Sequence, residues 1–67
     1  MGDALDNRLR EERTRRNLTQ AQLAELVGVS RKTINTVENG IFVPSTTLAL
    51  RLAKALETTV EGLFSLR

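Results

Sequence analysis

Apolar residues recur at intervals of three and four along most of the chain, the spacing that places them on one face of an α-helix. The clearest such stripe consists of Leu48, Leu52, Ala55 and Leu56. Shorter stretches with the same spacing begin at Leu5 and Leu23. Valine and threonine are scattered and do not alternate with polar residues over the length of a strand. The pattern predicts an all-α protein without strands.

Residue types that cap helices mark five expected helix starts. The expected caps are Asp3 or Asp6, Thr19, Ser30, Ser45 and Thr59. Gln22 follows Thr19 at the spacing of a capping box. The first helix is expected at residues 5–16, the second after Thr19 to about residue 27, and the third at residues 31–39. Each is followed by a residue that tolerates the left-handed conformation: Asn17, Gly28 and Gly40. The fourth follows Ser45, and a short fifth contains Val60, Leu63 and Phe64.

Only Gly28-Val29-Ser30 separates the second expected helix from the third. A turn this short, opened by glycine, makes two helices cross steeply, which is the geometry of a helix-turn-helix. Ala24 is small enough to lie where the two helices touch. The joint core is expected to comprise Leu23, Val27, Val29, Ile34 and Val37. This combination favours a DNA-binding helix-turn-helix over an ordinary helical hairpin.

The third expected helix has two different sides when its residues are placed 100° apart. Ile34, Val37, Glu38 and Ile41 fall on the inner side. The outer side and its flanks carry basic, amide and hydroxyl groups, namely Arg31, Lys32, Thr33, Asn35, Thr36 and Asn39. An ordinary solvated face in a chain with 27% charged residues would mix both signs, yet residues 31–37 include no acid. Arg and Lys suit the edge of guanine and Asn suits adenine, so this face can read a major groove.

The stretch LTQAQLAELVGVSRKTINTVENG, residues 18–40, resembles the helix-turn-helix of the phage-repressor (Cro/C1, XRE-type) family. Pro44-Ser45 and the sequence TVEGLF at 59–64 resemble the later helices of the same fold. The similarity extends from about Asn7 to Leu66. It implies a five-helix, lambda-repressor-like DNA-binding domain spanning residues 1–67, with its helix-turn-helix at about 19–39.

The resemblance also implies roles for individual residues. Base and phosphate contacts are expected from Arg31, Lys32, Thr33 and Thr36, with Asn35 a further base-reading candidate on the same face. Phosphate contacts are expected from Gln20 and Asn39, and Gln20 would also brace the third helix. Arg13 and Glu38 match an ion pair that ties the first helix to the third, in agreement with the inner position of Glu38.

The chain departs from the family pattern at several positions outside the third helix. Residues 41–43 are Ile-Phe-Val, where relatives often carry basic and polar residues. Glu57 stands where a helix-ending glycine is common. Gly62 either lowers the propensity of the fifth helix or allows another chain to approach closely. We expect these departures to alter docking rather than DNA binding itself.

Composition excludes several other classes of protein. The 67 residues include no Cys and no His, so disulfides, Cys/His zinc sites and the commonest catalytic bases and nucleophiles are excluded. Aromatic residues make up 3%, which argues against a stacking platform for single strands. We find no apolar run that could span a membrane and no signal peptide. We expect a cytoplasmic, nucleoid-associated protein of prokaryotic or phage-like type that is not an enzyme and needs no cofactor or metal.

The expected partners are double-stranded DNA and a second copy of the chain. One unit reads only a few base pairs, so specific binding normally uses two units about one helical turn apart on a near-palindromic site. The residues expected at the dimer interface are Leu50, Leu63, Phe64 and Leu66; burial in the monomer core is the alternative, and for Leu63 it is at least as well supported. A solvated helix face is the preferred interpretation of Arg8, Arg10, Arg15 and Arg16, and contact with phosphate is the alternative.

The sequence leaves two questions of function open. The simplest regulatory action is repression through occlusion of a promoter, but neither the sign of regulation nor the operator can be derived. An antitoxin-like or adaptor domain that uses the same fold to bind a protein partner is the alternative to a DNA-binding regulator.

Overall fold

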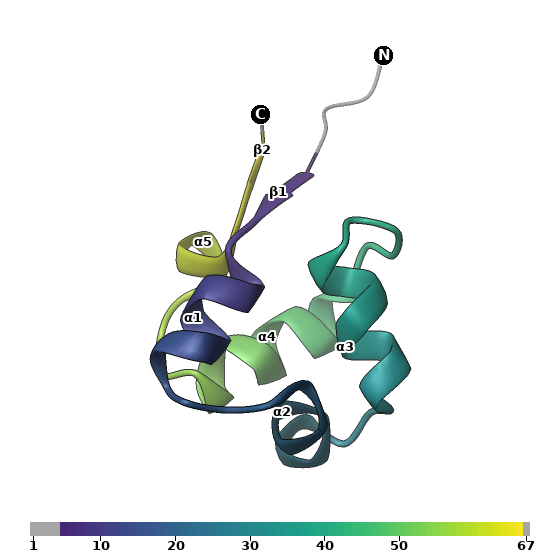
Figure 1. The fold of residues 1–67 in the computed structure, drawn as a ribbon. Helices are drawn as coiled ribbons and strands as arrows, with labels where there is room; N and C mark the ends of the chain where they lie inside the picture. The colour runs from purple at the N-terminus through teal and green to yellow at the C-terminus, as the bar shows by residue number, and fades with distance from the viewer. Residues whose placement is uncertain (1–4, 67) are drawn as a thin grey trace.

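Five helices pack around one apolar core in the computed structural model, which describes residues 5–66 (Figure 1). The helices are α1 (Leu9–Arg15), α2 (Gln20–Val27), α3 (Arg31–Glu38), α4 (Thr46–Ala55) and α5 (Val60–Leu63). Two short strands, β1 (Leu5–Asn7) and β2 (Phe64–Leu66), flank them in sequence. The expectation of five helices is confirmed. None of the helices in the described part of the chain is long and apolar enough to cross a membrane.

Side-chain caps start four of these helices as the sequence predicts. The Thr19 hydroxyl accepts a hydrogen bond from the Gln22 amide at 3.0 Å, and the Gln22 side chain accepts one from the Thr19 amide at 2.8 Å. This reciprocal pair is a complete capping box. The caps Ser30, Ser45 and Thr59 each accept from the backbone amide three residues later.

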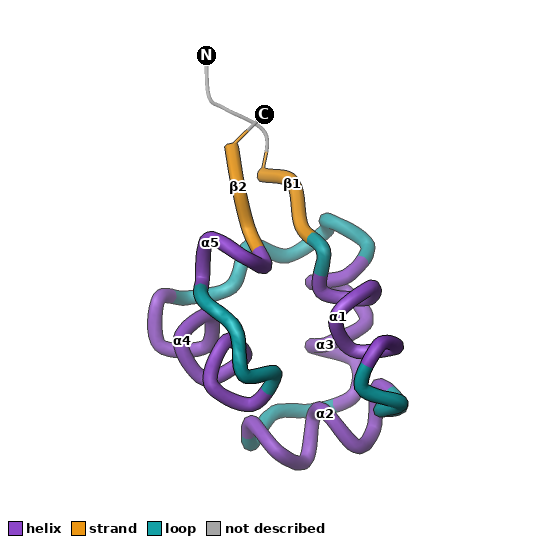
Figure 2. Tube along the Cα trace, turned by 90° about the vertical axis from the view of Figure 1, so that its left-hand side faces the viewer, coloured by secondary structure: helices purple, strands orange, loops and turns teal. Residues whose placement is uncertain are grey.

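The prediction of a chain without strands is wrong. β1 and β2 pair antiparallel, with Leu5 opposite Leu66 and Asn7 opposite Phe64 (Figure 2). Residue periodicity did not reveal this pairing because it joins three-residue segments from opposite ends of the sequence. Phe64, expected in the fifth helix, therefore begins β2.

The start of the first helix also differs from the prediction. α1 begins at Leu9 rather than residue 5, because residues 5–7 are extended in β1. Arg8 occupies the N-cap position, so Asp6 is not the cap, and Asp3 lies outside the described residues. The Asn7 side chain accepts a hydrogen bond from the Leu9 amide at 3.3 Å.

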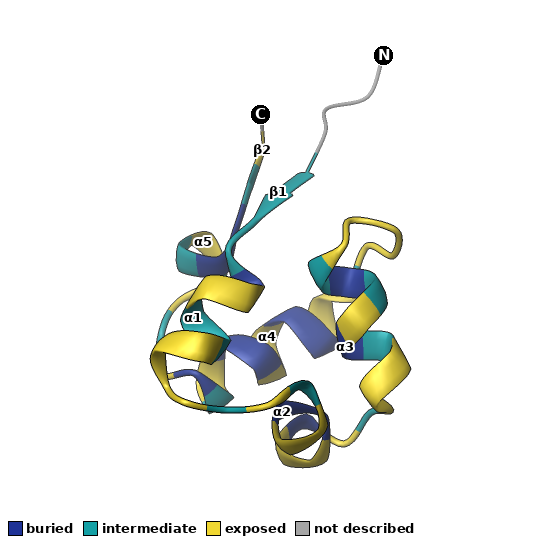
Figure 3. Cartoon of the chain, viewed as in Figure 1, coloured by how far each residue is buried: buried dark blue, intermediate teal, exposed yellow. Residues whose placement is uncertain are grey.

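The core is a single cluster of buried apolar side chains between the helices (Figure 3). It includes four of the expected helix-turn-helix core residues, Leu23, Val27, Ile34 and Val37, and Val29 packs against it. Ile41, expected on the inner side of the third helix, is instead 77% exposed. The reason is that α3 ends at Glu38 and the chain turns away through Gly40, whose φ of 73° is left-handed.

Glu57 holds a left-handed conformation after α4, with φ of 54°. This conformation costs a residue with a Cβ atom about 1–2 kcal/mol, whereas glycine adopts it freely but loses more backbone entropy on folding. We expect Glu57→Gly to raise the free energy of unfolding by about 0.5–1 kcal/mol in urea denaturation. Glu57→Ala is the matched control, because it also removes the exposed pair with Arg16 (3.4 Å) but keeps the strain. Equal stability of the two variants would contradict this account.

Gly62 lies against the side chain of Thr58, which would have to shift if a larger residue replaced the glycine. A Cβ atom at this position would lie 2.5 Å from the Thr58 hydroxyl oxygen, closer than real Cβ atoms approach. This close approach is made by a group of the same chain; the approach of another chain to Gly62 stays a prediction.

Candidate DNA-binding surface

α2 and α3 form a helix-turn-helix. Gly28 adopts φ of 75° after α2, and the Val29 amide donates to the Ala24 carbonyl at 3.0 Å, which closes the turn. Ala24 is buried, with 3% of its surface exposed, and the two helices pack against each other. Figure 1 views α2 nearly along its axis and α3 from the side, so the helices cross steeply. This packing fixes which side of α3 faces solvent.

The solvent side of α3 carries most of the residues expected to meet DNA. Arg31, Lys32, Asn35 and Asn39 are exposed, and Thr33 and Thr36 are half-buried. The Thr36 hydroxyl donates to the Thr33 carbonyl at 3.0 Å, and the Thr33 hydroxyl lies 3.0 Å from that of Ser30. The two threonines are thus partly engaged within the helix, which leaves Arg31 and Lys32 as its freest polar groups.

Glu38 points away from this surface, and its carboxylate is fully buried. Arg13 from α1 donates to it through Nε at 2.6 Å and through Nη2 at 3.2 Å. The third Arg13 contact runs from Nη1 to the Leu18 carbonyl at 2.8 Å. The structure thus brings the two residues of the expected ion pair together, and their contact joins α1 to α3.

Two opposing effects act on the pKa of Glu38. Burial raises the pKa of this carboxyl, but hydrogen bonds from Arg13, Gln20 and Arg10 outweigh it, so the pKa lies below its ordinary value of 4.5. The hydrogen bond to Glu38 in turn raises the pKa of Arg13 against the opposing effect of burial.

The lowered pKa of Glu38 predicts a stability that depends on pH. A carboxyl whose pKa is lower in the folded than in the unfolded protein stabilises the fold above its unfolded pKa, and this stabilisation is lost as the pH falls through the folded value. We expect the free energy of unfolding to fall below about pH 4.5, and to fall less in Glu38→Gln, which cannot titrate. Urea denaturation between pH 7 and pH 3 measures both slopes. Parallel slopes would show that Glu38 does not cause the acid sensitivity.

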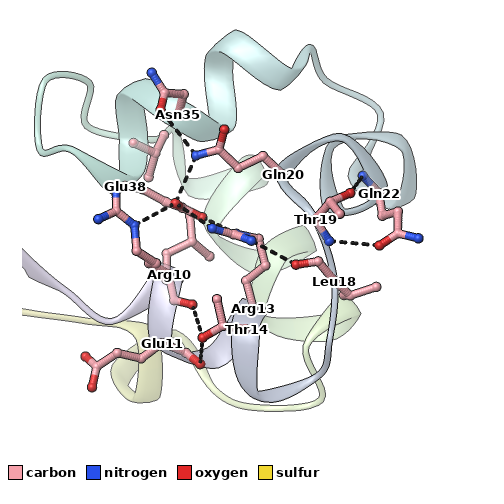
Figure 4. A network of polar contacts seen from close by, with 12 residues as sticks. Arg10, Glu11, Arg13, Thr14, Leu18, Thr19, Gln20, Gln22, Asn35 and Glu38 are labelled. Atoms are coloured by element: carbon pink, nitrogen blue, oxygen red, sulfur yellow. Dashed lines mark hydrogen bonds and ion pairs between the residues drawn. The ribbon is translucent and has the colours of Figure 1, made fainter.

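The polar contacts extend from Glu38 to the exposed face of α3 (Figure 4). Gln20, at the start of α2, donates through Nε2 to Glu38 at 3.1 Å and to Asn35 at 3.2 Å. Arg10 donates to Glu38 at 3.3 Å and to the Asn39 side chain at 3.2 Å. Side chains from α1 and α2 therefore hold the amides of Asn35 and Asn39 in place.

Arg10 is the member of this network that the sequence interpretation missed. The interpretation as a solvated face is incomplete for Arg10, because its side chain is 58% exposed and yet contacts Glu38 and Asn39. The available signal was its position three residues before Arg13, which places both side chains on one face of α1. Arg15 fits the solvated interpretation better, since it is 73% exposed and pairs with Glu12 on the same helix.

Residues 9–63 match a family model described as helix-turn-helix. The chain belongs to this family, HTH_3. The HTH_3 fold here is the lambda-repressor-like five-helix fold that the resemblance implies.

Several proteins similar to this HTH_3 chain are named as regulators of transcription. An uncharacterized HTH-type transcriptional regulator of Bacillus subtilis, YgzD, is 40% identical over 60 residues, covering 90% of this chain and 91% of that protein. An uncharacterized HTH-type transcriptional regulator of Methanothermobacter thermautotrophicus is 48% identical over 59 residues, covering 87% and 86%. The crystal structure of the restriction-modification controller protein C.AhdI from Aeromonas hydrophila matches with a TM-score of 0.78 and 40% identity, covering 82% of this chain and 83% of that one. This HTH_3 chain is thus a transcriptional regulator with a DNA-binding fold.

The structure of the HTH_3 chain corrects two of the four residues expected at a dimer interface. Leu63 is fully buried and Phe64 is 8% exposed, so both belong to the monomer core, the alternative that the sequence left open. Both belong to the core cluster that also contains Leu9 of α1. The backbone beside them is paired, since the Arg8 amide donates to the Leu63 carbonyl at 2.8 Å and Asn7 lies opposite Phe64. Leu50 and Leu66 remain exposed, at 57% and 68%.

Proposed function

We propose that the protein is a sequence-specific repressor that binds a near-palindromic operator in double-stranded DNA as a homodimer, with α3 in the major groove. It would act as a single domain and repress by occluding a promoter. The observation that supports this most is that the two sides of α3 differ in charge. Glu38, the acid of this helix, is buried and paired with Arg13, while Arg31, Lys32 and Asn35 face solvent.

The start of α3 offers a recess suited to a nucleic-acid group. Gln20, Arg31, Lys32 and Asn35 line a hollow of about 270 Å³ between the first turns of α2 and α3. Two of its four lining side chains are cationic. Such a surface attracts phosphate without regard to sequence and places the first turn of α3 where base edges can be read.

Selection from random DNA duplexes with the purified protein tests this function. We expect enrichment of a near-palindromic sequence with half-sites about one helical turn apart. A promoter that overlaps this sequence should lose activity in a transcription assay when the protein is added, and activation would show that the sign is wrong. Failure to enrich any duplex would favour the alternative of a protein-binding module on the same fold.

The proposed dimer rests on exposed leucines outside the core. Leu50→Glu and Leu66→Glu each place a charge on an apolar side chain that would be covered in the dimer, so sedimentation at low salt should show a shift from dimer to monomer. Leu26→Glu on α2, where the leucine is 62% exposed, is the matched control and should leave the dimer intact. If the wild type is a dimer and both test variants remain dimeric, the interface lies elsewhere.

A further inference from the structure

The network around Glu38 fixes which end of each side-chain amide faces which neighbour. A carboxylate can only accept hydrogen bonds, so the Gln20 group 3.1 Å from Glu38 must be its NH₂. The same nitrogen lies 3.2 Å from the Asn35 side chain (Figure 4). The atom of Asn35 that meets it must be an acceptor, which is Oδ1.

Arg10 fixes the network from the opposite end. A guanidinium can only donate, so Asn39 must accept from it through Oδ1, at 3.2 Å. The NH₂ of Asn39 then donates to the Asn35 backbone carbonyl at 2.8 Å and to Asn35 Oδ1 at 3.1 Å. Both ends of the network thus assign the same orientation to Asn35, and its Oδ1 accepts from two donors.

These assignments leave different groups free on the two residues. The two acceptor positions of Asn35 Oδ1 are occupied, so the group that Asn35 offers to a ligand is its NH₂, a donor. Both amide hydrogens of Gln20 are used, so Gln20 offers only its carbonyl oxygen. A phosphate oxygen is itself an acceptor and cannot be bound by that group.

We propose that Asn35 donates to a major-groove acceptor of a base and does not pair bidentately with adenine, and that Gln20 is a positioning residue for Asn35 rather than a phosphate ligand. This inference rests on the proposed function and narrows the base class that Asn35 reads. The usual pairing of Asn with adenine needs a free Oδ1 to accept from the 6-amino group, and here Oδ1 is occupied. The acceptors open to the Asn35 NH₂ are O6 and N7 of guanine, O4 of thymine and N7 of adenine, whereas cytosine presents only a donor.

The test is duplex selection with wild type, Asn35→Ala and Gln20→Ala. We expect Asn35→Ala to weaken, by about 5- to 100-fold, a preference at one operator position for a base with a major-groove acceptor over cytosine. Gln20→Ala should relax the same position and leave affinity for random duplex within about twofold, since losing a phosphate contact would weaken all sequences alike. The double variant should be no more relaxed at that position than Asn35→Ala alone. Gln22→Ala, an exposed glutamine on the same helix, should leave the preference unchanged.

Two results would overturn this inference while the proposed function stands. One is an adenine at the Asn35-dependent position whose replacement by purine, which lacks the 6-amino group, removes the preference. The other is a Gln20→Ala variant that binds all sequences equally less well and keeps its preferences. If the wild type enriches no sequence, the proposed function fails and the base assignment fails with it.

The arrangement of the amides can also be tested without DNA. In NMR spectra of the free protein, Asn35→Ala should shift the side-chain NH₂ resonances of Gln20 because their acceptor is removed. Lys32→Ala, at an exposed neighbour in the same recess, should not. Unshifted Gln20 resonances in Asn35→Ala would overturn the arrangement and the inference drawn from it.

Discussion

Replacement of Glu38 by alanine is expected to lower the free energy of unfolding by about 3–5 kcal/mol. The Arg13 side chain is 11% exposed, and without Glu38 its charge would remain buried with only the Leu18 carbonyl as a partner. A domain of this size buries a limited core and has little stability to spare. Thermal and urea unfolding should therefore show a variant that is largely unfolded at 37 °C.

Two further variants isolate the cause of this loss. Glu12→Ala breaks the Glu12–Arg15 pair, whose arginine is 73% exposed, and should cost less than about 1 kcal/mol. Replacement of both Arg13 and Glu38 by Met and Leu should cost less than Glu38→Ala alone, because no charge is left buried. A Glu38→Ala variant as stable as Glu12→Ala would show that the buried pair does not hold α1 to α3.

Arg31→Ala is expected to lose about 1–3 kcal/mol of discrimination between the selected operator and random duplex. Arg31 is exposed in the first turn of α3 and lines the recess beside Lys32. A guanidinium in that place can donate to both O6 and N7 of one guanine, and alanine can do neither. Dissociation constants for both duplexes, measured at one salt concentration, give the discrimination directly.

Lys54→Ala is the matched control for Arg31→Ala. Lys54 is also an exposed cation, but it lies on α4, outside the helix-turn-helix. Its removal should leave discrimination between the two duplexes unchanged. If Arg31→Ala weakens binding to operator and random duplex by the same factor, Arg31 contacts phosphate and does not read a base.

The parts of the fold that the sequence predicted are those decided by neighbouring residues. The Thr19–Gln22 capping box and the caps Ser30 and Ser45 act over three residues, so their spacing alone identifies them. The inner position of Glu38 followed from the helical angle. Its surroundings in the structure, with Arg13 at 2.6 Å, show why an acid can lie there.

The parts that were missed depend on contacts between distant segments. The β1–β2 pair joins residues 5–7 to residues 64–66, and Leu63 and Phe64 are buried in a core to which distant segments contribute. The orientation of the Asn35 amide depends on Gln20 and Asn39, which are in turn fixed by Glu38 and Arg10. Residue type alone suggested adenine for Asn35; only the positions of these partners show which of its atoms is free.

The paired strands bring the entry and exit points of the fold together, with Leu5 opposite Leu66 (Figure 2). Cross-strand neighbours in an antiparallel pair lie about 4.5–5.5 Å apart, a gap that an ordinary surface turn already spans. Exposed turns are where inserted domains are best tolerated. The fold can therefore be inserted as a domain into an exposed turn of another protein without increasing the distance between the two ends of that turn. A short linker across the same gap, with new ends opened in the exposed loop 41–43, would give a circular permutant in which α2 and α3 stay contiguous.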